Sequence, residues 1–202
     1  MQSLILASGN PGKLKEFQQL LAGAGFKVQP QSDYDVPECD ETGLTFIENA
    51  ILKARNACIY TGLPSIADDS GLAVDALNGA PGIYSSRFGG SDATDNDNNQ
   101  LLLEKMRLVP DELRGARFHC VLAFMRHEND PTPMICHGSW EGKILKGASG
   151  TNGFGYDPLF YLSEHKCTSA ELEPAEKNRL SHRARAMDLL LNQMQNKILD
   201  NI

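Results

Sequence analysis

The sequence lacks an excess of positive charge, closely spaced cysteines and long apolar runs. Among its 202 residues, Lys and Arg number 19 and Asp and Glu number 26, so the formal charge at pH 7 is −7. A surface with this balance repels a phosphate backbone, which argues against a long nucleic acid as a partner. A small anionic ligand remains compatible with the sequence if basic side chains gather locally and a metal ion assists.

The cysteines and the apolar segments exclude further classes of protein. The five cysteines are Cys39, Cys58, Cys120, Cys136 and Cys167. Their spacing fits neither a zinc knuckle nor a redox motif. No apolar run approaches the roughly 20 residues of a membrane helix, and the opening residues do not resemble a secretory signal. We therefore expect a reduced, soluble, cytoplasmic protein that binds neither membrane nor nucleic acid.

Short apolar runs and amphipathic stretches follow one another along the chain, which is typical of an α/β protein. Strands are predicted at Leu4–Ala7, Ser65–Ala67, Arg117–Met125 and Met134–Trp140. Helices are predicted from Pro11 through Leu21, from the cap Thr45 to about Tyr60, from Asn99 to Met106, and from about Ser181 onward. Leu72–Val74 either continues the strand at Ser65 or pairs with it as a hairpin. Without repeats or a low-complexity linker, residues 1–202 are expected to form one domain, with two lobes allowed.

A glycine loop separates the first predicted strand from the first helix. Its sequence is Ser8-Gly9-Asn10-Pro11-Gly12-Lys13. Backbone N–H groups at a helix start attract phosphate, and Lys13 would add a full charge. The Walker pattern fails, because Ala7 and Leu14 occupy two of its defining positions. A plain turn with an exposed lysine explains the segment equally well.

An acidic pair, Asp68-Asp69, follows an apolar strand and precedes Ser70. Two adjacent carboxylates repel each other, and hard oxygen ligands of this kind suit Mg²⁺. Glu41 is a plausible third carboxylate, and Ser70 could bond a phosphate. The alternative is a solvated turn that uses the Asp side chains for local hydrogen bonds. Lys53 matters only if its helix packs beside this pair, since otherwise it is an ordinary surface lysine.

Two later segments combine unusual residues. In Gly153-Phe154-Gly155-Tyr156-Asp157-Pro158, the glycines expose an aromatic ring that could stack on a base, with Asp157 accepting a hydrogen bond from base or ribose. A turn with Phe154 in the core is the alternative. In Ser181-His182-Arg183, positive charge at a helix start opposes the helix dipole unless an anion or a carbonyl group lies nearby. Exposed basic residues that tolerate a small penalty are the alternative.

Taken together, these segments closely resemble the inosine/xanthosine triphosphate pyrophosphatase family, also called Ham1-like. The resemblance extends over essentially the whole chain and includes the segments already described. Further matching segments are Glu41-Thr42-Gly43, Phe46-Ile47-Glu48-Asn49-Ala50, Ala67-Asp68-Asp69-Ser70-Gly71-Leu72 and Gly79-Ala80-Pro81-Gly82-Ile83-Tyr84-Ser85-Ser86-Arg87. Ser8 stands where many members have Thr, a change that keeps the hydroxyl group.

The resemblance implies a two-lobed α/β fold with a mixed sheet and a deep central cleft, usually as a homodimer. It implies hydrolysis of ITP, dITP and XTP to the monophosphate and pyrophosphate. By position, Glu41, Asp68 and Asp69 would hold Mg²⁺ and the attacking water, with Asp69 as candidate general base, while Lys13 and Lys53 act on the phosphates. The residues expected to bind the nucleotide are Ser8, Gly9, Asn10, Pro11, Gly12, Lys13, Ser70, Phe154, Gly155, Tyr156, Asp157, Lys177, His182 and Arg183.

Two alternatives to this function are open on the sequence alone. One is a related pyrophosphatase with another base preference, and the other is a nucleotide-binding protein without turnover. The acidic pair together with Lys13 favours an enzyme, because a binding protein does not need to activate water. Whether Asp69 takes the proton or holds the metal is also open, because a carboxylate bound directly to Mg²⁺ is a weaker base.

Overall fold

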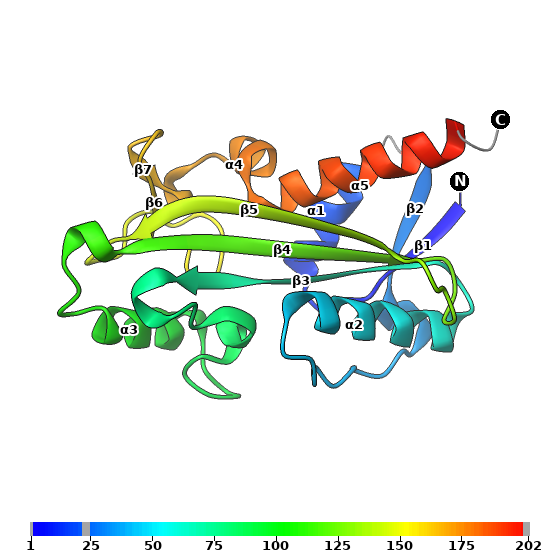
Figure 1. Cartoon of the computed structure of the whole chain (residues 1–202), viewed down its shortest axis with the longest axis horizontal. Coiled ribbons are helices and arrows are strands. Elements are labelled where there is room, and N and C mark those ends of the chain that lie inside the picture. The colour runs from blue at the N-terminus through cyan, green and yellow to red at the C-terminus, as the bar shows by residue number, and fades with distance from the viewer. Residues whose placement is uncertain (1, 22–24, 200–202) are drawn as a thin grey trace. The chain divides into compact units, whose positions relative to one another are not determined.

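The computed structural model describes residues 2–21 and 25–199 and has an α/β fold (Figure 1). Its strands are hydrogen-bonded in the order β2-β1-β3-β4-β5-β6-β7. The strands are β1 Gln2–Leu6, β2 Phe26–Pro30, β3 Ser65–Val74, β4 Gly115–Met125, β5 Met134–Ile144, β6 Phe160–Leu162 and β7 Cys167–Thr168. The helices are α1 Pro11–Leu21, α2 Phe46–Thr61, α3 Asp95–Lys105, α4 Pro174–Leu180 and α5 His182–Leu199. β1 pairs in parallel with β2 and β3, whereas β6 pairs antiparallel with β5 and β7, so the sheet is mixed as expected.

The chain divides into two compact units. Unit 1 contains residues 1–69, 120–138 and 183–202, and unit 2 contains residues 70–119 and 139–182. β3, β4 and β5 each have residues in both units. The two units are described separately below.

In unit 1 the sheet carries a hydrophobic core on each of its faces. Leu4 and Leu6 of β1 pack with the apolar side chains of α1 and α5, including Phe17 and Leu190. Ile5, the residue between them, packs on the other face with the small side chains of α2. Figure 1 shows the same division, with α1 and α5 on one side of the strands and α2 on the other. The alternation of side chains along a strand therefore assigns the residues of β1, and Ile66 and Ala67 of β3, to one of two helical layers.

In unit 2 a third core gathers around aromatic side chains. Phe160 contacts both Phe118 and Trp140, with ring centroids 4.6 Å apart for Phe118 and Phe160 and 5.6 Å apart for Trp140 and Phe160. Leu102 and Met106 add the apolar side of α3 to this core.

The starts of the two best-defined helices follow from their caps. Thr45 accepts a hydrogen bond from the backbone N–H of Glu48, and the left-handed Gly62 ends α2 after Thr61, which confirms the predicted helix. Thr94 and Asp97 form a capping box, so α3 begins at Asp95. The predicted start of that helix at Asn99 was therefore four residues late.

Some elements of the described chain were missed by pattern reasoning. β2 has five residues and ends in Pro30, which is tolerated because the strand lies at the sheet edge. α4 spans only Pro174–Leu180, and β6 and β7 have three and two residues. These lengths are too short for a periodic apolar pattern. None of the helices in the described part of the chain combines the length and apolar character needed to cross a membrane.

Candidate active site

The acidic pair lies inside a strand rather than at the end of one. β3 runs without interruption from Ser65 to Val74, so Leu72–Val74 is a continuation of the strand and not a hairpin partner. Successive side chains of a strand point to opposite faces of the sheet. Asp68 therefore shares the face of Ile66, toward α1 and α5, whereas Asp69 shares the face of Ala67, toward α2.

On the α2 face, both carboxylate oxygens of Asp69 accept hydrogen bonds from the helix. Lys53 donates from Nζ to Asp69 Oδ1 at 2.9 Å and to Glu41 Oε1 at 2.8 Å. The side-chain amide of Asn49 donates from Nδ2 to Asp69 Oδ2 at 3.3 Å. Asn49 and Lys53 are four residues apart on α2, which places them on one face of the helix. The structure thus joins Glu41, Lys53 and Asp69, and it meets the condition under which Lys53 belongs to the site, namely that its helix packs beside the acidic pair.

On the opposite face, Asp68 lies between two cations. Lys13 Nζ lies 2.9 Å from Asp68 Oδ1, and Arg183 Nη2 donates to Asp68 Oδ2 at 3.2 Å. The other terminal nitrogen of Arg183, Nη1, donates to Glu16 Oε2 at 2.6 Å. The side chain of Asp68 is 0% exposed, against 9% for Asp69 and 24% for Glu41. Of the three expected metal ligands, Asp68 is the one already enclosed by protein cations.

These surroundings move the two neighbouring pKa values in opposite directions. Burial raises the pKa of Asp69 above its ordinary value, and Lys53 only partly offsets this effect. Burial acts in the same way on Asp68, but Lys13 and Arg183 hold the pKa of that carboxyl far below its usual range. Burial alone would lower the pKa of Lys53, whereas the carboxylates around it, led by Asp69, raise it. A pair of acids whose pKa values diverge in this way is typical of a catalytic site.

The glycine loop is organised by Asn10, which acts as a cap for α1. Asn10 Oδ1 accepts from the backbone N–H groups of Gly12 at 2.8 Å and Lys13 at 3.2 Å. The backbone N–H of Asn10 in turn donates to Ser8 Oγ at 3.2 Å. Pro11 is the first helical residue, where a missing N–H is harmless. The loop therefore directs Lys13 toward Asp68, and its Ser8 and Asn10 side chains serve the backbone.

In unit 2, the glycine-flanked aromatic side chain lies at the surface. Phe154 is 41% exposed, and Lys177 Nζ lies 4.9 Å from the centroid of its ring. The buried Asp157 accepts hydrogen bonds from Lys177 Nζ, from the backbone N–H of Phe154 and from Ser169 Oγ. Gly153 has φ +80°, and a Cβ there would lie 2.0 Å from Asp157 Oδ2, so only glycine fits. Asp157 thus holds the loop and Lys177 in place beneath an accessible ring.

Other expected base-pocket residues have structural contacts. Tyr156 is buried, and its hydroxyl donates to the carbonyl oxygen of Ser85 at 2.8 Å. The backbone of Gly155 is held by Asp95 Oδ2 at 2.7 Å and by Asn99 Nδ2 at 2.8 Å. These contacts hold the loop against Ser85, Asp95 and Asn99.

The remaining expected residues are divided between the units. His182 is buried and stacks on Phe118, with ring centroids 4.9 Å apart. Ser70 is half-buried in the part of β3 that belongs to unit 2. Arg183, expected in the base pocket, belongs to unit 1 and pairs with Asp68 and Glu16.

Two residues of the site were not singled out from the sequence. Asn49 was quoted only as part of a matching segment, and Glu16 lies 167 positions from Arg183, the residue it binds. Both look unremarkable in sequence, as polar residues on helices. The signal for Asn49 is that a helix position facing the sheet carries an amide, which requires a buried hydrogen-bond partner.

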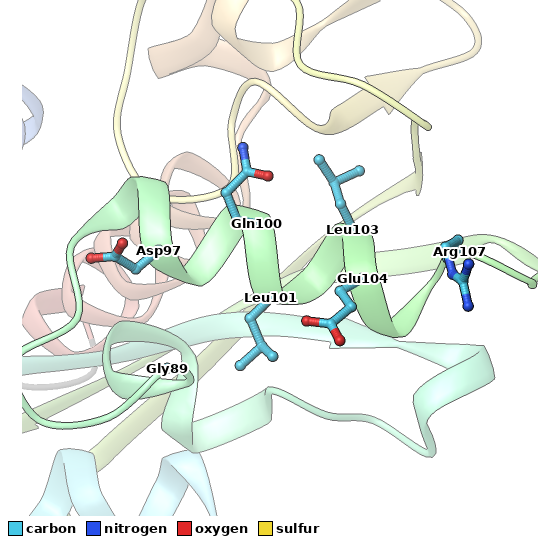
Figure 2. A pocket seen from close by; sticks show the side chains of 7 residues that line it. All are labelled: Gly89, Asp97, Gln100, Leu101, Leu103, Glu104 and Arg107. Atoms are coloured by element: carbon cyan, nitrogen blue, oxygen red, sulfur yellow. The ribbon is translucent and has the colours of Figure 1, made fainter.

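Among the described residues, no three His, Cys, Asp or Glu side chains form a ready-made metal cluster. A hollow of about 660 Å³ lies against α3 in unit 2 (Figure 2). It is lined by Gly89, Asp97, Gln100, Leu101, Leu103, Glu104 and Arg107. None of the expected site residues lines this hollow, so it does not mark the candidate active site.

The fold and the charged groups define an α/β protein with carboxylates and lysines suited to phosphate chemistry. The model of the Ham1 family matches residues 4–193, and the chain belongs to that family. It is 62% identical over 190 residues to the dITP/XTP pyrophosphatase of Photobacterium profundum, covering 94% of this chain and 96% of that protein. It is 57% identical over 196 residues to the dITP/XTP pyrophosphatase of Escherichia coli (strain K12), covering 97% and 100%. The structure of a HAM1 protein from Coxiella burnetii matches with a TM-score of 0.92 at 52% identity, covering 97% and 100%.

The ion network around Asp68 generates a prediction about stability. Replacing Arg183 with methionine removes one of the two cations that neutralise this buried carboxylate. We expect the free energy of unfolding at neutral pH to fall by about 3–5 kcal/mol, because a buried charge loses its partner. The depressed pKa of Asp68 stabilises the fold above its unfolded pKa of about 3.9 and stops doing so as the pH falls. The difference between the two proteins should therefore keep its full size from about pH 7 to about 4 and shrink only as the pH falls below about 4.

Urea denaturation at several pH values, followed by the fluorescence of Trp140, measures this difference. Lys146→Met is a matched control, because Lys146 forms an exposed ion pair with Asp111 and its removal should change stability little. Equal effects of the two substitutions at every pH would contradict the assigned role of Arg183.

Proposed function

We propose that this chain hydrolyses ITP, dITP and XTP to the corresponding monophosphate and pyrophosphate. The observation that carries the proposal is the arrangement at Asp69, a carboxylate with a raised pKa that Lys53 links to Glu41. This arrangement occurs in a chain whose full-length relatives are named dITP/XTP pyrophosphatases. Removing deaminated purines from the nucleotide pool would be the purpose of the reaction.

The chemistry of the donors fits Mg²⁺. Glu41 and Asp69 present hard carboxylate oxygens at the same ammonium group, and the side chain of Glu41 is 24% exposed while that of Asp69 is 9% exposed. Mg²⁺ usually takes one or two protein carboxylates and completes its shell with phosphate oxygens and water. We assign the metal to Glu41 and Asp69, and we assign to Asp68 the orientation of Lys13 and Arg183. When bound, the ion would neutralise phosphate charge and acidify the attacking water.

The remaining catalytic work falls to residues of unit 1. Lys13 and Lys53 supply fixed positive charges that offset the negative charge developing on the phosphate oxygens. Asp69 accepts a hydrogen bond from the attacking water and aligns it with the α-phosphorus.

The base is assigned to residues of unit 2. The exposed ring of Phe154 offers a face for stacking, and Lys177 and His182 supply donors. Inosine and xanthosine carry a carbonyl at C6, where adenine carries an amino group. A donor left unpaired by adenine costs about 1–3 kcal/mol, which is the basis we propose for selectivity.

Two further parts of the proposal concern the enzyme in the cell. We expect a homodimer, as the family resemblance implies, and light scattering in solution would test the assembly. We also expect the enzyme to act in the cytoplasm. Its five cysteines are free, which fits a reducing compartment.

A substrate panel tests the proposed activity. We expect pyrophosphate release from ITP and XTP to exceed release from ATP by about 5- to 100-fold in kcat/KM, because adenine leaves the donors unpaired. Omitting Mg²⁺ should abolish turnover of every nucleotide. Equal turnover of ATP and ITP would contradict the selectivity, and no turnover at all would contradict the enzymatic function.

Asp69→Asn tests the role of the Asp69 carboxylate. The change keeps the size of the side chain and removes its charge, so we expect kcat to fall by at least about 100-fold, with nucleotide binding largely intact. Isothermal titration with a slowly hydrolysed nucleotide measures the binding. Asp75→Asn is the control, because Asp75 pairs with Arg117 in unit 2 and should leave turnover unchanged. Near-normal turnover by Asp69→Asn would remove this residue from the mechanism.

Phe154→Ala tests the stacking platform. Loss of a base-stacking ring costs about 1–3 kcal/mol, so KM for ITP should rise by about tenfold while kcat changes little. Phe154→Trp keeps an aromatic face and should behave like the unaltered enzyme. An unchanged KM in the alanine variant would show that the base binds elsewhere.

A further inference from the structure

Both polar atoms of the fully buried Asn49 side-chain amide form hydrogen bonds. Asn49 stands in the first turn of α2, and its Oδ1 accepts a hydrogen bond from the backbone N–H of Gly43 at 2.8 Å. Its Nδ2 donates to Asp69 Oδ2 at 3.3 Å. Turning the amide over would face N–H against N–H and oxygen against carboxylate, so the two partners define its orientation.

The contact with Gly43 depends on close packing of the loop that carries Glu41. A Cβ added to Gly43 would lie 2.5 Å from the Cβ of Glu48 and 2.7 Å from Asn49 Oδ1. Glycine is therefore required for the backbone to approach α2 so closely. Two residues before it, Glu41 reaches Lys53 at 2.8 Å. Helix α2 thus links this loop to Asp69 twice, once through Asn49 and once through Lys53.

The two links differ in stiffness. Lys53 ends in a point charge on a flexible four-carbon chain, and in the proposed reaction it also serves the phosphates. A carboxylate held only by Lys53 at Oδ1 could rotate about its Cβ–Cγ bond. The second hydrogen bond, from the short and buried side chain of Asn49 to Oδ2, defines the plane of the carboxylate.

We propose that Asn49 is a positioning residue for the reaction: it fixes the plane of the Asp69 carboxylate and ties it to the loop of Glu41. The inference rests on the proposed function, because it presumes that Asp69 aligns the attacking water. Asn49 acts through Asp69, so its loss should slow the chemical step more than it weakens nucleotide binding.

Asn49→Asp tests this role with a minimal change of shape. The new side chain can still accept from Gly43, but it faces Asp69 with an oxygen in place of a donor. With saturating ITP and Mg²⁺, we expect kcat to fall by about 10- to 100-fold while KM changes by less than about threefold. A variant with unaltered kcat, or one in which KM alone rises, would overturn the inference.

Asn98 offers a matched control in unit 2. It occupies the same position after its helix cap, is buried, accepts from the N–H of Gly89 at 2.8 Å and donates to the carbonyl oxygen of Ser86 at 3.1 Å. Asn98→Asp likewise replaces an N–H donor with an oxygen, but the group that this oxygen faces is a backbone carbonyl and not a carboxylate. It should lower the melting temperature as Asn49→Asp does, but it should change kcat by less than about twofold. Equal losses of kcat in both variants would reduce Asn49 to a structural residue and overturn the inference.

An exchange of the two side chains keeps the inference testable if Asn49→Asp folds poorly. In the double variant Asn49→Asp with Asp69→Asn, an amide and a carboxylate again face each other, with the donor on the other side. We expect its melting temperature to recover relative to Asn49→Asp, while turnover stays absent as in Asp69→Asn. No recovery would show that the contact does not carry the effect.

The unaltered enzyme separates this inference from the proposed function. Absence of pyrophosphate release from any nucleotide by the unaltered enzyme would overturn both. Normal release by the unaltered enzyme together with normal kcat in Asn49→Asp would overturn the role of Asn49 alone.

Discussion

The alternation of side chains along β3 is the constraint on which the candidate site depends. Two neighbouring carboxylates repel each other when their side chains lie close together. Because successive side chains of a strand point to opposite faces, β3 separates the side chains of Asp68 and Asp69. Each face is covered by different helices, so each carboxylate meets its own cations. One pKa falls and the other rises. A difference in environment and in the direction of the pKa shift between two identical residues thus follows from their position in a pleated strand.

The network around Asp68 shows what a fully buried charge contributes. Asp68 contacts Lys13 and Arg183, and Arg183 in turn contacts Glu16. Lys13 and Glu16 belong to α1 and Arg183 to α5, which lie at opposite ends of the sequence. Buried ion pairs contribute little net stability, because desolvation offsets their attraction, although breaking one is costly. In this site the ion pairs act mainly by fixing the positions of the side chains. Asp68 holds the ammonium of Lys13 at a defined place at the start of α1, where a triphosphate can use it.

Strongly periodic segments made the α/β fold and several helices predictable from the sequence, and the acidic pair was located because carboxylates rarely follow an apolar run. Continuation of β3 through Asp68-Asp69-Ser70-Gly71 was one of two alternatives that the sequence left open, because these residues disfavour strands and only pairing with neighbouring strands overrides that preference. Arg183 was assigned to the base by resemblance, and only the structure revealed its bonds to Asp68 and Glu16. Contacts that join positions far apart in sequence leave no local pattern.

The hydrogen bonds of Asp69 bear on whether it takes a proton or holds the metal. Each carboxylate oxygen has two acceptor positions, and α2 uses one on Oδ1 through Lys53 and one on Oδ2 through Asn49. Such bonds stabilise the charged form, and a bound cation would stabilise it further, so both weaken the carboxylate as a base. They also restrict its rotation, which improves it as an acceptor that aligns water. In the proposed reaction, Asp69 therefore contributes first through orientation, while a bound metal ion would make the water acidic enough to react.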